Sequence, residues 1–204
     1  MGVIPIELES FIQWIACIIG ILLGLVVQGE AQEYFVHMFE VYSKRTKIEY
    51  DLNPIHHVSI WSIPVLLFAG WGWSARKVAE PDYFPSSPIP RFLLPLSAPV
   101  ANMALAGIIG TLYIFLPIPF FRIITAISIQ MAVANCLIPI PPLALGRSLS
   151  RPFGPLAARQ LTIERWGAVL LAFLVVLDYY TNLSIFRPWI MQISEGILRW
   201  VLKL

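Results

Sequence analysis

The stretch FLLPLSAPVANMALAGIIGTLYIFLPIPFF, residues 92–121, decides the fold of this chain because it contains no Asp, Glu, Lys or Arg. An uncharged, mainly apolar run of about 18 residues or more is typical of a transmembrane helix. Prolines lie near both ends of the run: Pro95, Pro99, Pro117 and Pro119. Because proline interrupts helical hydrogen bonding, we expect one spanning helix centred on Ala98–Phe115.

Further apolar runs with at most one charged residue lie on both sides of this stretch. We therefore expect an all-α membrane protein with about five transmembrane helices and an amphipathic C-terminal helix, at the interface or against the bundle. Trp71 and Trp73, at the end of the second run, precede two basic residues, which is typical of an interfacial anchor. The runs are Phe11–Val27, Val58–Ala75, Ala98–Phe115, Ile123–Ile138 and Trp166–Phe186, followed by the tail Trp189–Leu204.

The composition supports this membrane assignment. Hydrophobic residues make up 58% of the chain and charged residues 13%, whereas soluble domains are roughly 45–50% apolar and about 25% charged. The net charge is only +2, and Lys and Arg form no aromatic-interleaved stripe, which excludes a nucleic-acid partner. We expect a single domain over residues 1–204 in a bacterial inner membrane or an equivalent energy-transducing membrane. The expected partners are the lipid bilayer and other membrane subunits.

The segments between the runs are expected to be loops. Alternating residue types at Lys47–Tyr50 permit a short β-hairpin near residues 44–53, ahead of the turn signal Asn53-Pro54. Prolines restrict residues 81–90, and polar side chains are frequent in residues 147–165. Both segments are therefore predicted to be loops.

Four short motifs follow one another along the chain. They are Leu52-Asn53-Pro54-Ile55-His56-His57, Gly70-Trp71-Gly72-Trp73, Ser97-Ala98-Pro99-Val100-Ala101-Asn102 and Asn135-Cys136-Leu137-Ile138-Pro139-Ile140-Pro141-Pro142-Leu143. In order and spacing they resemble the compact form of the site-2 protease family of intramembrane metalloproteases, over about residues 10–200. The resemblance implies a zinc site of two histidines one helical turn apart and a distant aspartate. It also implies a glutamate that activates the zinc-bound water.

The residues at these positions cannot perform that chemistry. When the first helix is aligned through Asn53-Pro54, the His-Glu-x-x-His positions become Gln28-Gly29-Glu30-Ala31-Gln32, and the aspartate position becomes Ala144. A glutamine amide is a feeble zinc ligand compared with imidazole or carboxylate, and alanine offers no donor atom. We therefore expect no catalytic residue, no bound metal and no cofactor. The vestigial positions are Gln28, Gly29, Gln32 and Ala144.

Ionisable residues remain on one face of the helix that follows Gln28, at Glu30, Glu33, His37 and Glu40. One interpretation is a non-standard metal or proton site at Glu30, Glu33 and His37, because ionisable groups at membrane depth are costly and often functional. The favoured interpretation is a helix end that has reached the headgroups. The chain has three histidines, none of them spaced i, i+4: His37, His56 and His57.

Four further residues are expected to line the former catalytic cleft in a structural role: Asn53, Pro54, Asn102 and Asn135. Side-chain amides can satisfy irregular backbone, which is tolerated at membrane depth only where protein lines it. Asp178 lies in the last apolar run and needs a partner, such as an arginine or a backbone donor, unless that run ends there. His56 and His57 are expected to be interfacial, and adjacent side chains point apart, so at most one could join a polar site.

The sequence favours a non-catalytic membrane subunit, a pseudoprotease acting as a scaffold or accessory component of a larger membrane complex. Two alternatives stay open. One is a pseudoprotease that holds a substrate helix or a lipid in the vestigial cleft without cutting it. The other is an intramembrane metallopeptidase with a non-standard metal site.

Overall fold

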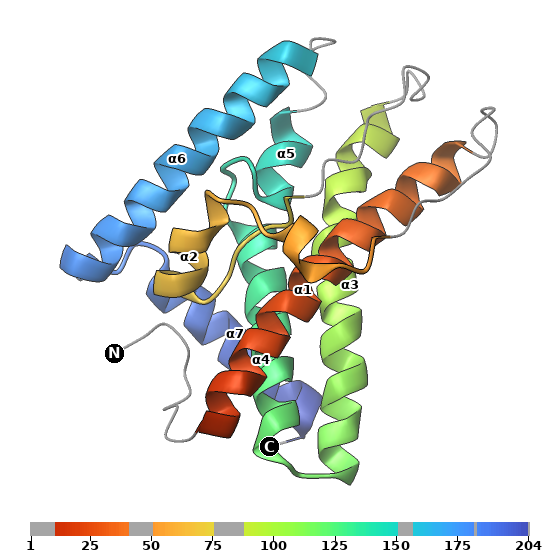
Figure 1. Ribbon diagram of the computed structural model, residues 1–204, viewed down its shortest axis with the longest axis vertical. Helices are drawn as coiled ribbons and strands as arrows, with labels where there is room; N and C mark the ends of the chain where they lie inside the picture. The colour runs from red at the N-terminus through yellow and green to blue at the C-terminus, as the bar shows by residue number, and fades with distance from the viewer. Residues whose placement is uncertain (1–10, 41–50, 76–87, 151–156, 182, 204) are drawn as a thin grey trace.

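The computed structural model describes residues 11–40, 51–75, 88–150, 157–181 and 183–203 (Figure 1). Within these ranges the regular structure is helical, and the only bridge of β type is an isolated antiparallel pair, Val58 with Ser74. The helices are α1 Phe11–Glu40, the 3₁₀ turn η1 Pro54–His57, α2 Ser62–Ala69, α3 Pro88–Phe115, α4 Pro119–Leu137, α5 Ala144–Ser150, α6 Ala157–Thr181 and α7 Arg187–Leu202. The all-α prediction is confirmed for these residues. The expected hairpin near 44–53 falls mostly outside them.

Helix α4 forms the centre of the molecule, and α1, α3 and α7 pack around it. Every residue from Ile123 to Asn135 is buried, as expected for a helical stretch that carries no charge on any face. The hydroxyls inside it bond to the preceding turn of the same helix: Thr125 Oγ1 donates to Phe121 O at 2.8 Å and Ser128 Oγ to Ile124 O at 2.9 Å. These bonds allow polar side chains to be buried without partners on other helices.

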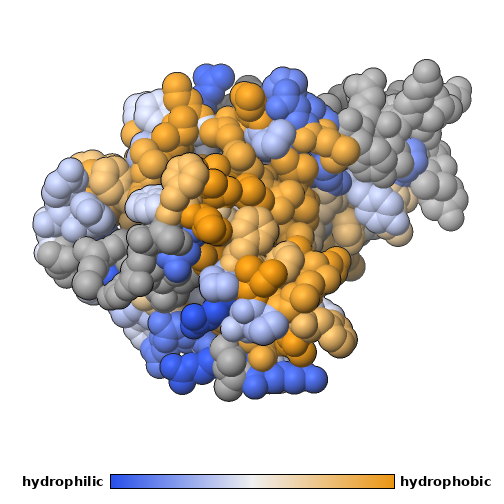
Figure 2. All heavy atoms as spheres, turned by 60° about the horizontal axis from the view of Figure 1, so that its bottom comes forward, coloured by the Kyte–Doolittle hydropathy of each residue, from blue (hydrophilic) through white to orange (hydrophobic). Residues whose placement is uncertain are grey.

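Three of the described helices are long and apolar enough to cross a membrane: Phe11–Met38, Phe92–Phe115 and Pro119–Leu137. The first of them presents large apolar side chains outward, with Phe11 79% and Trp14 56% exposed. Hydrophobic atoms fill the centre of the view in Figure 2, and hydrophilic residues lie toward its margins. Such an apolar exterior is compatible with a lipid environment. The number of about five spans remains a prediction.

The structure corrects the prediction of a spanning helix over Val58–Ala75. Helix α2 has eight residues, about 12 Å of helix, which is well short of a hydrocarbon core of about 30 Å. It ends at Gly70, whose φ of 76° is in the left-handed region that favours glycine. The chain then turns inward, so Trp71 and Trp73 are buried and do not serve as interfacial anchors. The Trp71 ring meets that of Phe186 edge-on, with centroids 6.3 Å apart.

Two predicted loops are partly helical. Residues 147–150 belong to α5 and residues 157–165 to α6. The second of these segments is rich in Ala, Arg, Gln, Leu and Glu, which are strong helix formers. Helix α3 begins at Pro88, inside the predicted loop 81–90, since proline is tolerated in the first turn of a helix. Residues 81–87 and 151–156 lie outside the described part of the chain.

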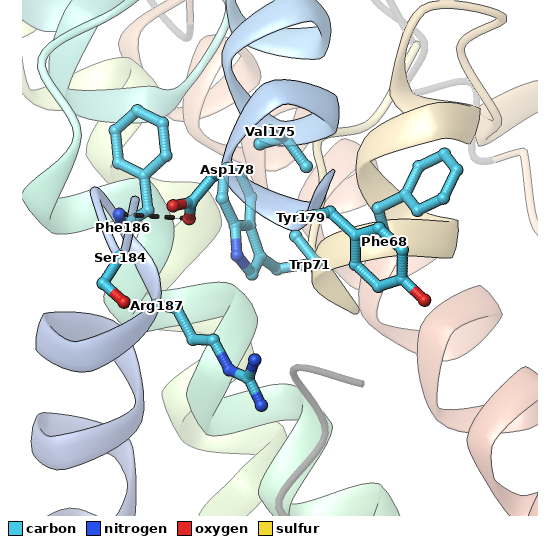
Figure 3. A pocket seen from close by; sticks show the side chains of 9 residues that line it. Phe68, Trp71, Val175, Asp178, Tyr179, Ser184, Phe186 and Arg187 are labelled. Atoms are coloured by element: carbon cyan, nitrogen blue, oxygen red, sulfur yellow. Dashed lines mark hydrogen bonds between the residues drawn. The ribbon is translucent and has the colours of Figure 1, made fainter. Parts of the chain in front are cut away.

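Helix α6 ends at Thr181, short of the predicted limit at Phe186. Asp178 in its last turn accepts hydrogen bonds from the backbone N–H groups of Ile185, at 2.8 Å, and Phe186, at 3.5 Å (Figure 3). The partners of this carboxylate are therefore backbone donors, which hold the connection to α7. Helix α7 packs on α3 and α4. It buries one residue per turn: Ile190, Ser194, Leu198 and Leu202.

Candidate functional site

Helix α1 carries three of the four positions that the resemblance assigns to the zinc site, and the side chains of Gln28 and Gln32 point into the protein. Gln28 and Gln32 lie one turn apart and are both buried. Gln28 Oε1 accepts a hydrogen bond from the backbone N–H of Ser74 at 3.2 Å. Gln32 Oε1 accepts one from Arg147 Nη1 at 3.2 Å. Both amide oxygens, the atoms that could have approached a metal, are thus engaged by protein donors.

Arg147 is the most unusual residue of the site, because its guanidinium is almost fully buried in the described structure. Its Nε donates to Glu164 Oε1 at 3.1 Å, so the charge is paired with a carboxylate on α6. A buried charge requires such pairing and hydrogen bonding. Arg147 therefore links α1, α5 and α6 through Gln32 and Glu164. Arg147 and Glu164 both lie in the predicted loop 147–165, so this link could not be predicted from the sequence.

Asn135 connects the ends of three segments. Its Nδ2 donates to Gly72 O at 3.1 Å and to Met131 O at 2.8 Å, and its Oδ1 accepts from the N–H of Ala144 at 3.2 Å. The last contact places the vestigial aspartate position, Ala144, at the start of α5 beside the end of α4. Ala144 supplies only a backbone group to this network.

Gly29 packs directly against His57. A Cβ atom at Gly29 would overlap the imidazole ring and lie 2.9 Å from Ser74 Oγ. The ring has no exposed surface. Its Nε2 lies 2.6 Å from Asp51 O, and its Nδ1 lies 3.0 Å from Ser74 Oγ. Because a carbonyl only accepts, Nε2 carries a hydrogen, and in the neutral ring Nδ1 then accepts from the serine hydroxyl. The expectation that His57 is interfacial is therefore wrong.

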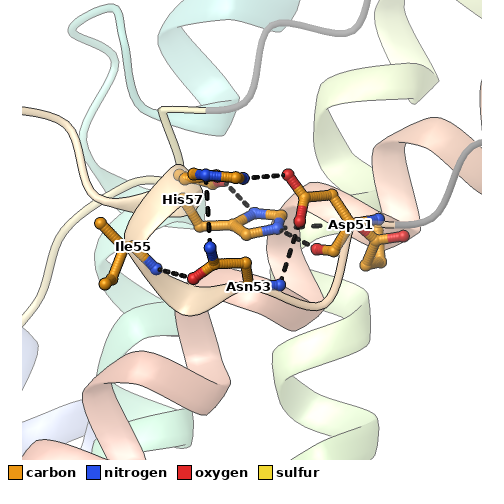
Figure 4. A network of polar contacts seen from close by, with 7 residues as sticks. Asp51, Asn53, Ile55 and His57 are labelled. Carbon is orange, nitrogen blue, oxygen red and sulfur yellow. Dashed lines mark hydrogen bonds and ion pairs between the residues drawn. The ribbon is translucent and has the colours of Figure 1, made fainter.

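The turn before η1 is held by a network around Asp51 (Figure 4). Asp51 Oδ1 accepts from the N–H of Asn53 at 3.0 Å, and Asp51 Oδ2 accepts from His56 Nδ1 at 2.6 Å. The His56 hydrogen bond, followed by that of Asn53, lowers the pKa of Asp51 below its usual value. Asn53 Oδ1 also accepts from the N–H of Ile55 at 3.1 Å, and Pro54 occupies the first position of η1. Asn53 and His56 are exposed.

The ionisable residues predicted to share one face of α1 do not gather at a single site in the structure. Glu30 turns toward the Asp51 turn: its Oε1 accepts from the N–H of Asp51 at 3.1 Å and lies 3.6 Å from His57 Nε2. Glu33 and His37 are half-buried further along the helix. No three His, Cys, Asp or Glu side chains among the described residues come close enough to hold one metal ion.

The donor set at the vestigial positions does not fit zinc. Structural and catalytic zinc sites use imidazole, thiolate or carboxylate ligands, whereas this site offers two neutral amides, a glycine and an alanine. The guanidinium of Arg147 on Gln32 also places a permanent positive charge where the second histidine ligand would lie.

Asn102 on α3 is fully buried, and neither amide atom has a hydrogen-bond partner among the described residues. A Cβ atom at Gly24, one turn before Gln28 on α1, would lie 3.6 Å from its Oδ1. Asn102 therefore faces α1 close to the vestigial site. It does not tie backbone segments together as Asn135 does.

Two cavities adjoin these residues. The larger, about 320 Å³, opens between residues 58–61 and 73–75 on one side and α5 and α6 on the other. Ser74 and Arg147 reach both this cavity and the vestigial positions. The smaller cavity, about 30 Å³, lies between Trp71, Asp178 and Arg187 (Figure 3). It holds no more than a water molecule or two.

Comparisons with known proteins give a limited result. No protein-family model matches the chain, and no solved structure matches it. A curated relative is the protein of Bacillus subtilis (strain 168) named "Putative zinc metalloprotease YwhC", which is 23% identical over 187 residues. The match covers 84% of this chain and 83% of that protein. It supports a metalloprotease-like relationship along most of the chain.

Proposed function

We propose that this chain is a non-catalytic membrane protein, a pseudoprotease built on a site-2 protease scaffold, which serves as a scaffold or accessory component of a larger membrane complex. One observation carries the proposal. At the position of the second zinc-binding histidine, the Gln32 amide accepts a hydrogen bond from the buried guanidinium of Arg147. That guanidinium is itself paired with Glu164.

The electrostatics of this arrangement oppose a divalent cation. An arginine side chain stays protonated at all ordinary pH values. Two buried charges interact more strongly than they would in water, so two positive charges repel each other more strongly there. Bringing a zinc ion to the same place would set two cations against each other at low dielectric. The ion would also compete for the Gln32 oxygen, so the arginine and the metal exclude one another.

A change of chemistry at the general-base position supports the same conclusion. The site-2 protease pattern has a glutamate at the position that aligns with Gly29 of this chain. A side chain there would overlap His57, which Asp51 and Ser74 hold in place. The space of a general base is therefore filled by a buried imidazole. That imidazole's nitrogens are both committed to other groups.

The apolar exterior motivates the remaining parts of the proposal. Beyond the three helices long enough to cross a membrane, α6 is 25 residues long and contains the apolar stretch Trp166–Leu177, and we propose that the whole of α6 crosses as well. Together with α6 these make four proposed membrane-crossing segments, so the chain would be a multi-pass protein of a bacterial inner membrane or an equivalent membrane. Other subunits would cover part of its exposed apolar surface.

Purification of the full chain in mild detergent tests the proposal. We expect less than stoichiometric zinc by elemental analysis, no cleavage of a transmembrane peptide substrate, and copurification of stoichiometric membrane proteins. Stoichiometric zinc that is lost in Glu33→Ala would favour the metallopeptidase alternative. A stable monomer without partners would contradict the role in a complex.

A second candidate function is a pseudoprotease that binds a helix or a lipid without cutting it. The observation in its favour is the cavity of about 320 Å³, because Ser74 and Arg147 join it directly to the vestigial positions. Crosslinking from a photoreactive residue at Gln32 distinguishes the two functions. Labelled transmembrane helices or lipids support binding, and labelling of this chain alone supports a scaffold.

A further inference from the structure

The wall of the larger cavity carries an excess of positive charge. Arg147 and Arg165 both line it, and Glu164 is the acidic residue between them. Arg147 uses Nε for Glu164 and Nη1 for Gln32, and no hydrogen bond joins its Nη2 to the described residues. Arg165 is exposed at the cavity mouth. One buried and one exposed guanidinium thus line the same cavity. The single carboxylate that lines it, Glu164, is already paired with Arg147.

Guanidinium groups bind phosphate and carboxylate oxygens through paired, charge-assisted hydrogen bonds. The remaining walls suit a ligand with an apolar part, because Val58, Ile60, Trp61 and Trp73 line them. At about 320 Å³ the space lies in the range of small-molecule sites. The lining therefore fits an anionic head attached to an apolar body.

The position of the cavity along α6 indicates where that ligand comes from. Arg165 is the last charged residue before the apolar stretch Trp166–Leu177, so the cavity lies where α6 passes from polar to apolar surroundings. The elements around the cavity also carry exposed apolar side chains, with Ile60 before α2, Leu67 in α2 and Trp166 in α6. Tryptophan and arginine at such a boundary are typical of the headgroup region of a membrane.

We propose that this cavity binds the phosphate group of an anionic phospholipid, with Arg147 and Arg165 as the phosphate-binding residues. The acyl chains follow the exposed apolar surface beside α2 and α6. The inference is independent of whether the chain belongs to a complex, since it depends only on the cavity and its charges. It names a ligand class for the space next to the vestigial site.

Lipid binding to the full chain in detergent tests this assignment. Native mass spectrometry is used to titrate phosphatidylglycerol and, separately, phosphatidylcholine. We expect tighter binding of phosphatidylglycerol to the unaltered chain. Arg165→Gln should weaken it about threefold, as for an exposed charge pair. Arg147→Gln should weaken it about tenfold, as for a buried charge-assisted hydrogen bond. Equal affinity for the two lipids would overturn the proposal.

Matched controls make the result specific. Arg199→Gln removes an exposed arginine from α7, away from the cavity, and should leave the affinity for phosphatidylglycerol unchanged. If Arg147→Gln does not fold because Glu164 loses its partner, Arg165→Gln still decides, because its side chain is exposed. A loss in Arg199→Gln as large as that in Arg165→Gln would overturn the site.

Inorganic phosphate distinguishes a lipid from a free anion. We expect millimolar inorganic phosphate to displace phosphatidylglycerol from the unaltered chain but not from Arg165→Gln. That result supports one phosphate site shared by both ligands. Inorganic phosphate that binds in an Arg165-dependent manner while phosphatidylglycerol does not would overturn the lipid as its source. High salt should weaken both ligands, because screening reduces interactions with an exposed charge.

Discussion

Replacing Gly29 with alanine tests whether His57 fills the space beside α1. The new Cβ would overlap the imidazole and lie 2.9 Å from Ser74 Oγ. The ring has no room to retreat, because it is fully buried and hydrogen bonded to Asp51 O and Ser74 Oγ. Overpacking of this kind costs about 1–3 kcal/mol. Loss of the serine hydrogen bond adds about 1 kcal/mol.

Helix propensity acts in the opposite direction, since alanine is favoured over glycine in a helix by about 1 kcal/mol. The net expectation for Gly29→Ala is a destabilisation of about 2 kcal/mol. For a chain of this length that corresponds to a fall of about 4–8 °C in the unfolding temperature. Thermal unfolding in detergent, followed by circular dichroism, measures it.

Two further variants complete the measurement. Gly107→Ala in α3 is the matched control, because a Cβ there meets nothing within 4 Å, and we expect it to be neutral or slightly stabilising. In a His57→Ala background the methyl group has space, so Gly29→Ala should no longer destabilise. The reasoning is refuted if Gly29→Ala is as stable as Gly107→Ala, or if its cost is unchanged without His57.

Three other predictions concern polar groups. Glu164→Leu should lower stability by about 3 kcal/mol, because it leaves the buried Arg147 guanidinium without its carboxylate; unchanged denaturant unfolding would contradict this. Asn102→Leu should be neutral or stabilising, since the Asn102 amide has no hydrogen-bond partner among the described residues. Asn135→Leu should destabilise the fold by about 2–3 kcal/mol, because three hydrogen bonds are lost. Equal changes in the stability of the two variants would refute this difference. The folded state lowers the pKa of Asp51, so its stabilising contribution is present above about pH 4 and is lost as pH falls through the lowered pKa. Asp51→Asn should therefore remove part of the acid sensitivity of unfolding measured between about pH 6 and pH 3.

The long apolar helices could be predicted from the sequence because their signal is local. Residues 92–121 and 123–138 need only length and the absence of charge to indicate a spanning helix, and α3 and α4 are found there. The segment 58–75 gave a similar signal but contains only the short α2. What differs is Gly70 in the left-handed region and the burial of Trp71 and Trp73 against distant residues. Hydropathy cannot distinguish an apolar segment that contacts lipid from one that contacts protein.

The polar contacts of the candidate site were less predictable, because each depends on a residue far away in the sequence. Gln28 and Gln32 could be located from the alignment of the first helix, but nothing local to them indicates Ser74 or Arg147 as partners. The ion pair between Arg147 on α5 and Glu164 on α6 was not predicted, because the polar character of residues 147–165 indicated a loop. A useful signal was available for Glu164, which lies among strong helix formers in residues 157–165.

The contact between Gln32 and Arg147 also bears on how the protein is made. The two residues are 115 positions apart, and chains are synthesised at about 5–20 residues per second. Helix α1 therefore waits about 6–23 s for its arginine after Gln32 leaves the ribosome. During that time its amides must be satisfied by water, by lipid headgroups or by a protein that assists insertion. The order of synthesis thus leaves the proposed membrane segment α1 without its contact to Arg147 until α5 has been made.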